Sequence, residues 1–214
     1  MAGPQYFREP EPGRVGVFLE RARTAALDWC AGRNWLWRSL LLLWLGYLGV
    51  RQFLDADYSV ACLFGGINLG IHEGGHLLAS GFGQFICSAM GSGLQLLVPV
   101  ISMFVFLKQR DYFGIAVCFG WLSTNLVQVG VYMSDARRMA LPLVTVGGGG
   151  GSIEKMHDWH YLFGRMGLLS SCEGIGAATR LLGHLSMLVC LAGGAWLLWQ
   201  MYTHQNAKRK TGNV

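Results

Sequence analysis

Residues 58–80 read YSVACLFGGINLGIHEGGHLLAS, an apolar run that ends with two histidines and a glutamate. A run of this length and composition predicts a membrane-embedded helix. On a helix, residues four apart share a face, so His72 and His76 can bind one metal ion while Glu73 lies beside them. This HExxH pattern is typical of zinc hydrolases, and ionisable residues inside a bilayer are usually functional. We therefore expect a zinc (Zn²⁺) site here, with packed polar residues in a helix core as the alternative.

The composition of the chain also favours a membrane protein. Of its 214 residues, 52% are hydrophobic and only 14% are charged. Soluble domains carry about 25% charged residues. The basic residues are not interleaved with aromatic residues on a polar domain, which argues against a nucleic-acid partner. Membrane lipids are therefore the expected surroundings.

Five apolar runs predict an all-α fold, a polytopic integral membrane helical bundle with about five transmembrane helices, within a range of four to six. The runs cover residues 35–54, 58–80, 94–107, 112–133 and 177–202. They form a single membrane-embedded domain over residues 35–203. Residues 1–34 form an N-terminal tail with an interfacial helix or a frayed segment, and residues 204–214 form a basic C-terminal tail.

The arginines before residue 35 predict that the N-terminus is cytoplasmic, because cytoplasmic flanks of transmembrane helices are enriched in Lys and Arg. The second run should then return towards the cytoplasm. Five spans would leave the basic residues 208–210 on the outer side, which conflicts with the same rule. An additional crossing and a re-entrant segment are both open explanations.

Two glycine-rich segments are expected to be irregular. Residues 81–93 are rich in Gly and Ser and nearly uncharged, which favours a non-helical connection tucked into protein or a cavity. The glycine run 147–151 predicts a flexible loop that serves as a hinge over the site or as a simple connector.

A catalytic zinc ion needs a third protein ligand in addition to His72 and His76. Asp135 at the end of the fourth run is one candidate, with pairing to a neighbouring arginine as its alternative. His157 and His160 can share a helix face and are further candidates, with Asp158 placed to orient an imidazole. The alternative for these residues is an ordinary cluster at the membrane interface.

Two other polar residues lie within the apolar runs. Asn125 can donate a hydrogen bond to a substrate carbonyl or oxyanion, or it can strap a helix backbone. His184 in the last run is expected to be a satisfied structural histidine. Haem binding by His76 with His184 is a further reading of these histidines.

In chain order, this pattern resembles the site-2 protease family of zinc intramembrane proteases. The resemblance covers about residues 67–140 and rests on these residues: His72, Glu73, Gly75, His76, Asn125 and Asp135. It implies that both histidines and Asp135 bind zinc, that Glu73 activates water, and that the HExxH helix runs towards the cytosol. The chain lacks the prolines that the family usually carries between Asn125 and Asp135.

The leading interpretation is therefore a zinc metalloendopeptidase that cleaves a partly unwound membrane-protein segment. Glu73 would take the proton of the attacking water and pass it to the leaving amine. The alternative is a non-catalytic subunit that retains a metalloprotease-like fold and packs against partner subunits of a larger membrane complex.

Overall fold

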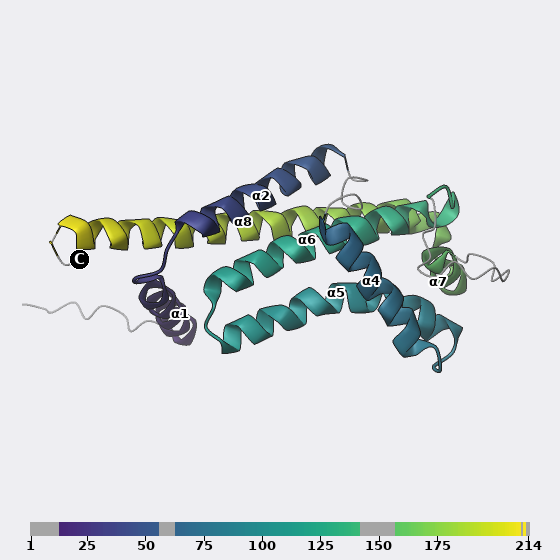
Figure 1. The fold of residues 1–214 in the computed structure, drawn as a ribbon. Helices are drawn as coiled ribbons and strands as arrows, with labels where there is room; N and C mark the ends of the chain where they lie inside the picture. Colours follow the sequence, from purple (N-terminus) through teal and green to yellow (C-terminus); the bar gives the residue numbers. More distant parts are fainter. Residues whose placement is uncertain (1–12, 56–62, 142–156, 211, 213–214) are drawn as a thin grey trace, which may run out of the picture.

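The computed structural model describes residues 13–55, 63–141, 157–210 and 212, and every regular element in these ranges is helical (Figure 1). The expected all-α fold is confirmed for these residues. The glycine run 147–151 lies outside them. The helices are α1 (Arg14–Cys30), α2 (Leu36–Leu54), α4 (Leu63–Ala79), α5 (Gln84–Lys108), α6 (Tyr112–Ser134), α7 (Asp158–Met166) and α8 (Cys172–Lys210). Two short 3-10 turns, η1 (Asp135–Arg137) and η2 (Leu169–Ser171), extend α6 and precede α8.

Three helical stretches are long and apolar enough to cross a membrane: Gln84–Lys108, Tyr112–Arg137 and Leu169–Ala207. Large apolar side chains also cover the outside of the bundle, and Leu43, Phe53 and Leu188 are each more than half exposed. A soluble monomer rarely exposes so much contiguous apolar surface. The surface thus suits a helical protein that lies in a membrane.

The antiparallel pair α6 and α8 forms the centre of the bundle (Figure 1). Small residues let the two backbones approach closely, as in many membrane helix pairs. A Cβ atom at Gly176 would meet the Gly130 carbonyl and the Ser134 hydroxyl, and one at Gly183 would lie 3.1 Å from the Ser123 carbonyl. Glycine is therefore required along this contact.

Helix α2 runs in the same direction as α6. Trp37, near its start, packs against Phe113 with ring centroids 6.3 Å apart, and Gln52, near its end, donates a 2.6 Å hydrogen bond to the Ser123 hydroxyl. Because Gln52 and Ser123 are both buried, this bond gives the Gln52 amide nitrogen and the Ser123 hydroxyl a partner where water cannot reach.

Helix α4 also runs in the direction of α6, so the expected return of the second run is wrong. Phe64 stacks on Trp121 with a centroid distance of 6.0 Å, and His72, two turns later, lies 6.1 Å from Tyr132. Asn68 of α4 bonds to Trp121 and Gln128 of α6, His72 bonds to Gln95 of α5, and both histidines contact Asp158 of α7. The histidines consequently lie at the end of the bundle opposite the start of α2.

The connection expected to be irregular over 81–93 is helical from Gln84 onwards, which corrects that prediction. Only a short turn that ends at Gly83, with φ of 83°, separates α4 from α5. The later glycines serve helix packing instead. A Cβ at Gly75 would collide with the Met90 carbonyl, so α4 and α5 can pair this closely only with glycine at that position.

The first and last described helices meet at the other end of the bundle (Figure 1). Gln205 donates a 3.0 Å hydrogen bond to the Arg33 carbonyl, and the rings of Trp35 and Tyr202 lie 5.6 Å apart. The basic tail that follows Gln205 therefore lies on the same side as α1. We refer to this end as the terminus end and to the opposite end, which carries His72, as the site end.

Candidate metal centre

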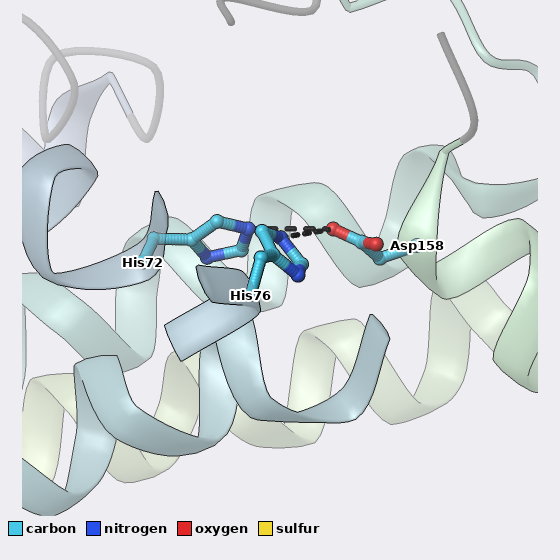
Figure 2. Close-up of side chains that lie close together, drawn as sticks. All are labelled: His72, His76 and Asp158. Atoms are coloured by element: carbon cyan, nitrogen blue, oxygen red, sulfur yellow. Dashed lines mark hydrogen bonds and ion pairs between the residues drawn. The ribbon is translucent and has the colours of Figure 1, made fainter. Parts of the chain in front are cut away.

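The two histidines of α4 converge on one carboxylate. His72 and His76 are one helical turn apart, and the Nε2 atom of each lies 3.3 Å from Oδ2 of Asp158. Figure 2 shows the two imidazoles side by side, with the carboxylate facing them. The three ligand atoms lie within 4.8 Å of one another, and this is the group that could hold a metal ion among the described residues.

Helix α7 places Asp158 opposite the two histidines. His157 caps the helix by accepting a 3.2 Å hydrogen bond from the His160 amide, which makes Asp158 the first helical residue. A carboxylate in the first turn is favoured by the helix dipole. The indole of Trp159 donates a 3.1 Å hydrogen bond to the Ser92 hydroxyl and so fastens α7 to α5.

The other imidazole nitrogens define which atoms face Asp158. Nδ1 of His72 lies 3.0 Å from Oε1 of Gln95, and Nδ1 of His76 lies 2.9 Å from the Cys87 carbonyl oxygen. Both oxygens accept, so the Nδ1 atoms donate, and each Nε2 atom is left to face Asp158 either with a proton or with a lone pair that can bind a metal ion. Metal-binding histidines are commonly oriented in this way.

This arrangement fits a metal ion. Two imidazole lone pairs and a carboxylate present only acceptors to one another, so a shared cation is required, either protons on the imidazoles or a metal. With bonds of about 2.0–2.2 Å, the ligand atoms around a tetrahedral zinc ion lie roughly 3.3–3.6 Å apart. The 3.3 Å separations from each Nε2 atom to Oδ2 agree with this geometry.

Asp158 is held as an anion in a buried place. Its residue is only 9% exposed, and burial alone would raise the pKa of its carboxyl. Hydrogen bonds and charge from His72 and His76 outweigh burial and hold this pKa at about 2. Tyr132 adds a further restraint, because its hydroxyl accepts a hydrogen bond from the Asp158 amide at 3.1 Å and lies 3.4 Å from Oδ2.

Glu73 lies close to this group without belonging to it. It is half-buried, and its charge acts on both His76 and Tyr132. Within the part of the chain that the structure describes, the group that could hold a metal ion consists of His72, His76 and Asp158, and Glu73 is not a member of it.

Gly91 of α5 makes room for the two imidazoles. A Cβ atom at this position would lie 2.5 Å from Nε2 of His76 and 2.7 Å from Nε2 of His72. Any side chain would therefore enter the space in which the ligand atoms meet. This explains a glycine in the middle of a long apolar helix.

Asp135 occupies a different place from the third ligand that the resemblance implies. It is buried at the end of α6, and its two oxygens accept hydrogen bonds from the amides of Ala140 and Leu141 at 3.0 and 2.9 Å. Oδ2 also lies 3.4 Å from Nε2 of His157, whose pKa is lowered by burial despite this contact. The arginines that follow do not pair with Asp135, since Arg137 and Arg138 both contact Glu173.

The remaining candidates lie outside the group of three. His160 bonds through Nδ1 to the Ala136 carbonyl at 2.8 Å. Asn125 is fully buried, and its amide donates to the Trp121 carbonyl one turn earlier, which is a strap to its own helix. His184 packs its ring against Phe53 and does not face His76, so the geometry offers no haem pair from these two histidines.

Residues that the sequence reasoning did not assign to the site are Gln95 and Tyr132. Gln95 is an isolated amide in the apolar stretch of α5, and a buried polar residue in such a stretch is itself a signal. Tyr132 has no such signal, because a tyrosine near the end of a membrane helix is ordinary.

Comparisons with known proteins give no match to a family model, a curated protein or a solved structure.

The metal content of variants shows whether Asp158 or Asp135 is the third ligand. We expect Asp158→Ala and His76→Ala to lose the metal, because each removes one of three ligands. Asp135→Ala should retain it, since Asp135 bonds to backbone amides instead. Elemental analysis of detergent-purified protein checks this. Metal lost from Asp135→Ala but retained in Asp158→Ala would contradict the arrangement described.

Gly91→Ala should also abolish metal binding while the helices stay formed, because alanine favours a helix but its methyl group meets both imidazoles. Gly93→Ala is the matched control on the same helix, since its Cβ would meet nothing closer than the Met90 sulfur at 3.8 Å. Metal content and helical circular dichroism are measured together. Equal metal content in the two variants would show that Gly91 is not needed for the site.

Proposed function

We propose that the protein is a zinc-dependent protease that hydrolyses peptide bonds within the membrane, a divergent relative of the site-2 protease-like enzymes. The observation that supports it most directly is the convergence of His72, His76 and Asp158, with Glu73 following His72 in the sequence and its charge acting on His76. This proposal takes Asp158 as the third ligand in place of Asp135. A His, His and carboxylate set leaves a fourth position open, as catalytic zinc sites require.

In this proposal, Glu73 and Tyr132 have different roles in the reaction. Bound zinc would polarise the scissile carbonyl and lower the pKa of its water. Glu73 accepts the proton of the attacking water and then returns it to the leaving amine. Tyr132 holds Asp158 through two contacts, so the carboxylate stays in place while charge changes around it.

The surroundings of α4 favour a membrane segment as substrate. Leu77 and Leu78, which follow His76 directly, are 76% and 67% exposed. A substrate can therefore approach along an apolar face next to the metal ligands. The carbonyls of a helix are occupied by hydrogen bonds, so the segment must be unwound where it is cut. A partly unfolded helix end is the substrate class that follows.

We further propose that both chain ends are cytoplasmic and that α5, α6 and α8 cross the membrane. On this topology, α2 and α4 advance one after the other towards the site end, which faces the non-cytoplasmic side. The terminus end carries most of the basic residues, as the positive-inside rule predicts for the cytoplasmic side. They include Arg14, Arg21, Arg23, Arg33, Lys108 and Arg110 and the tail 208–210. At the site end, Glu173 offsets part of the charge of Arg137 and Arg138.

Glu73→Gln should retain zinc and abolish cleavage, because the amide cannot accept the proton of the water. Membranes from cells that express the variant should accumulate intact substrates relative to wild type, as measured by quantitative proteomics of membrane peptides. Glu20→Gln on the exposed surface of α1 is the control. Zinc bound at full occupancy with no difference between wild type and Glu73→Gln would favour the non-catalytic subunit.

Cysteine accessibility tests the topology. In a background without native cysteines, Arg165→Cys in α7 should react with a membrane-impermeant maleimide on intact cells, because both the residue and its side of the membrane are exposed. Gln109→Cys in the turn before α6 should react only after the cells are permeabilised. The reverse labelling pattern would place the site on the cytoplasmic side.

A further inference from the structure

A chain of side-chain hydrogen bonds leads from His72 into the interior of the bundle. Nδ1 of His72 lies 3.0 Å from Oε1 of Gln95, whose amide nitrogen donates to Oε1 of Gln128 at 2.8 Å. The same oxygen accepts from the amide of Asn68 at 3.1 Å. Oδ1 of Asn68 in turn accepts from the indole nitrogen of Trp121 at 2.8 Å. Helices α4, α5 and α6 all contribute to this chain.

The indole at the far end determines the direction of every bond. An indole N–H can only donate, so Asn68 must turn its oxygen towards Trp121 and its NH₂ group towards Gln128. Gln128 must then present its oxygen, which obliges Gln95 to donate to it through its NH₂ group. The oxygen of Gln95 is left to face His72. Each amide would otherwise be free to turn over.

The direction of these hydrogen bonds determines which nitrogen of His72 carries the proton. With an oxygen opposite it, Nδ1 of a neutral His72 keeps the proton and Nε2 keeps its lone pair for a metal ion. If Gln95 were turned over, its NH₂ group would face Nδ1 and the proton would move to Nε2. A protonated Nε2 cannot bind a metal ion. The orientation of one amide therefore decides whether His72 can be a ligand.

The two amides that α4 and α5 contribute to this chain are buried, and the chain ends at His72. Asn68 is fully buried and Gln95 is only 4% exposed, so water has little access to them, while Gln128 and Trp121 are half-buried. Trp121 is held in place by Phe64, on which its ring stacks. His76 has no need of such a chain, because its Nδ1 faces the Cys87 backbone carbonyl, which cannot turn over.

We infer that Trp121 is a positioning residue of the metal centre, which acts through Asn68, Gln128 and Gln95 to hold His72 in its metal-binding tautomer. This inference rests on the proposed metal site and does not depend on which reaction the site performs. It gives a role to an indole that lies well away from the ligands themselves.

The test compares Trp121→Phe with Trp199→Phe, whose ring is 61% exposed on α8. Nitrogen-15 NMR of histidine-labelled protein loaded with zinc should show His72 protonated at Nδ1 and unprotonated at Nε2 in wild type and in Trp199→Phe. In Trp121→Phe the signal should shift towards the Nε2–H form. Zinc affinity should fall by about 10–100-fold, the usual effect of removing a group that orients a ligand.

A rescue variant separates orientation from packing. Glutamate at position 95 accepts from either oxygen, so Trp121→Phe combined with Gln95→Glu should recover the Nδ1–H tautomer and most of the zinc affinity. Asn68→Asp should reproduce the loss with the indole intact, because a carboxylate accepts from Trp121 but cannot donate to Gln128. It also serves as the test if Trp121→Phe fails to fold.

The outcomes separate the two proposals. Wild-type protein that binds no zinc overturns the metal centre itself. Zinc binding in wild type, with unchanged tautomer and affinity in Trp121→Phe and Asn68→Asp, overturns the role of Trp121 alone. A loss of affinity that Gln95→Glu does not recover would assign Trp121 to packing and also overturn the inference.

Discussion

The close pairing of α4 with α5 is the contact on which the site depends. Gly75 lets the backbones meet at Met90, and Gly91 leaves the space in which two imidazoles converge. Once the helices are this close, Gln95 and the Cys87 carbonyl lie opposite the Nδ1 atoms of the histidines. Any side chain at these glycines would separate the helices and the partners together. The same two glycines thus allow the helices to pack closely and the histidines to be oriented by their Nδ1 partners.

The buried side chains of the bundle become more polar towards the site end. Towards the terminus end, α5 exposes Leu97, Ile101 and Phe104, as a lipid-facing helix should. Towards the site end, the same helix carries Ser88, Ser92 and Gln95, all of them buried. Polar groups removed from water need partners inside the protein, and helices α4, α6 and α7 supply them. The histidines therefore lie where the bundle already provides hydrogen bonds.

The sequence allowed the helices and the two histidines to be predicted, because both depend on local patterns: long apolar runs, and a spacing of four residues on one helix face. The direction of α4 could not be predicted, since it depends on which half of α6 offers partners to Asn68 and His72. The glycines of 81–93 were ambiguous for a physical reason. Glycine serves irregular backbone and close helix packing equally well. Asp158 was expected to orient an imidazole, and only the docking of α7 through Trp159 brings its carboxylate to both Nε2 atoms.

Helix α8 is 39 residues long, or about 58 Å at 1.5 Å per residue, whereas the hydrocarbon core of a bilayer is about 30 Å thick. Its exposed apolar side chains begin at Leu181, so its first nine residues extend about 13 Å past them. Gly176 in that extension packs against Ser134, close to Tyr132 and the metal ligands. On the topology proposed above, the group of His72, His76 and Asp158 would therefore lie towards the edge of the hydrocarbon core, within reach of water. On that topology, a thicker bilayer would cover more of this extension and leave less water within reach of the group.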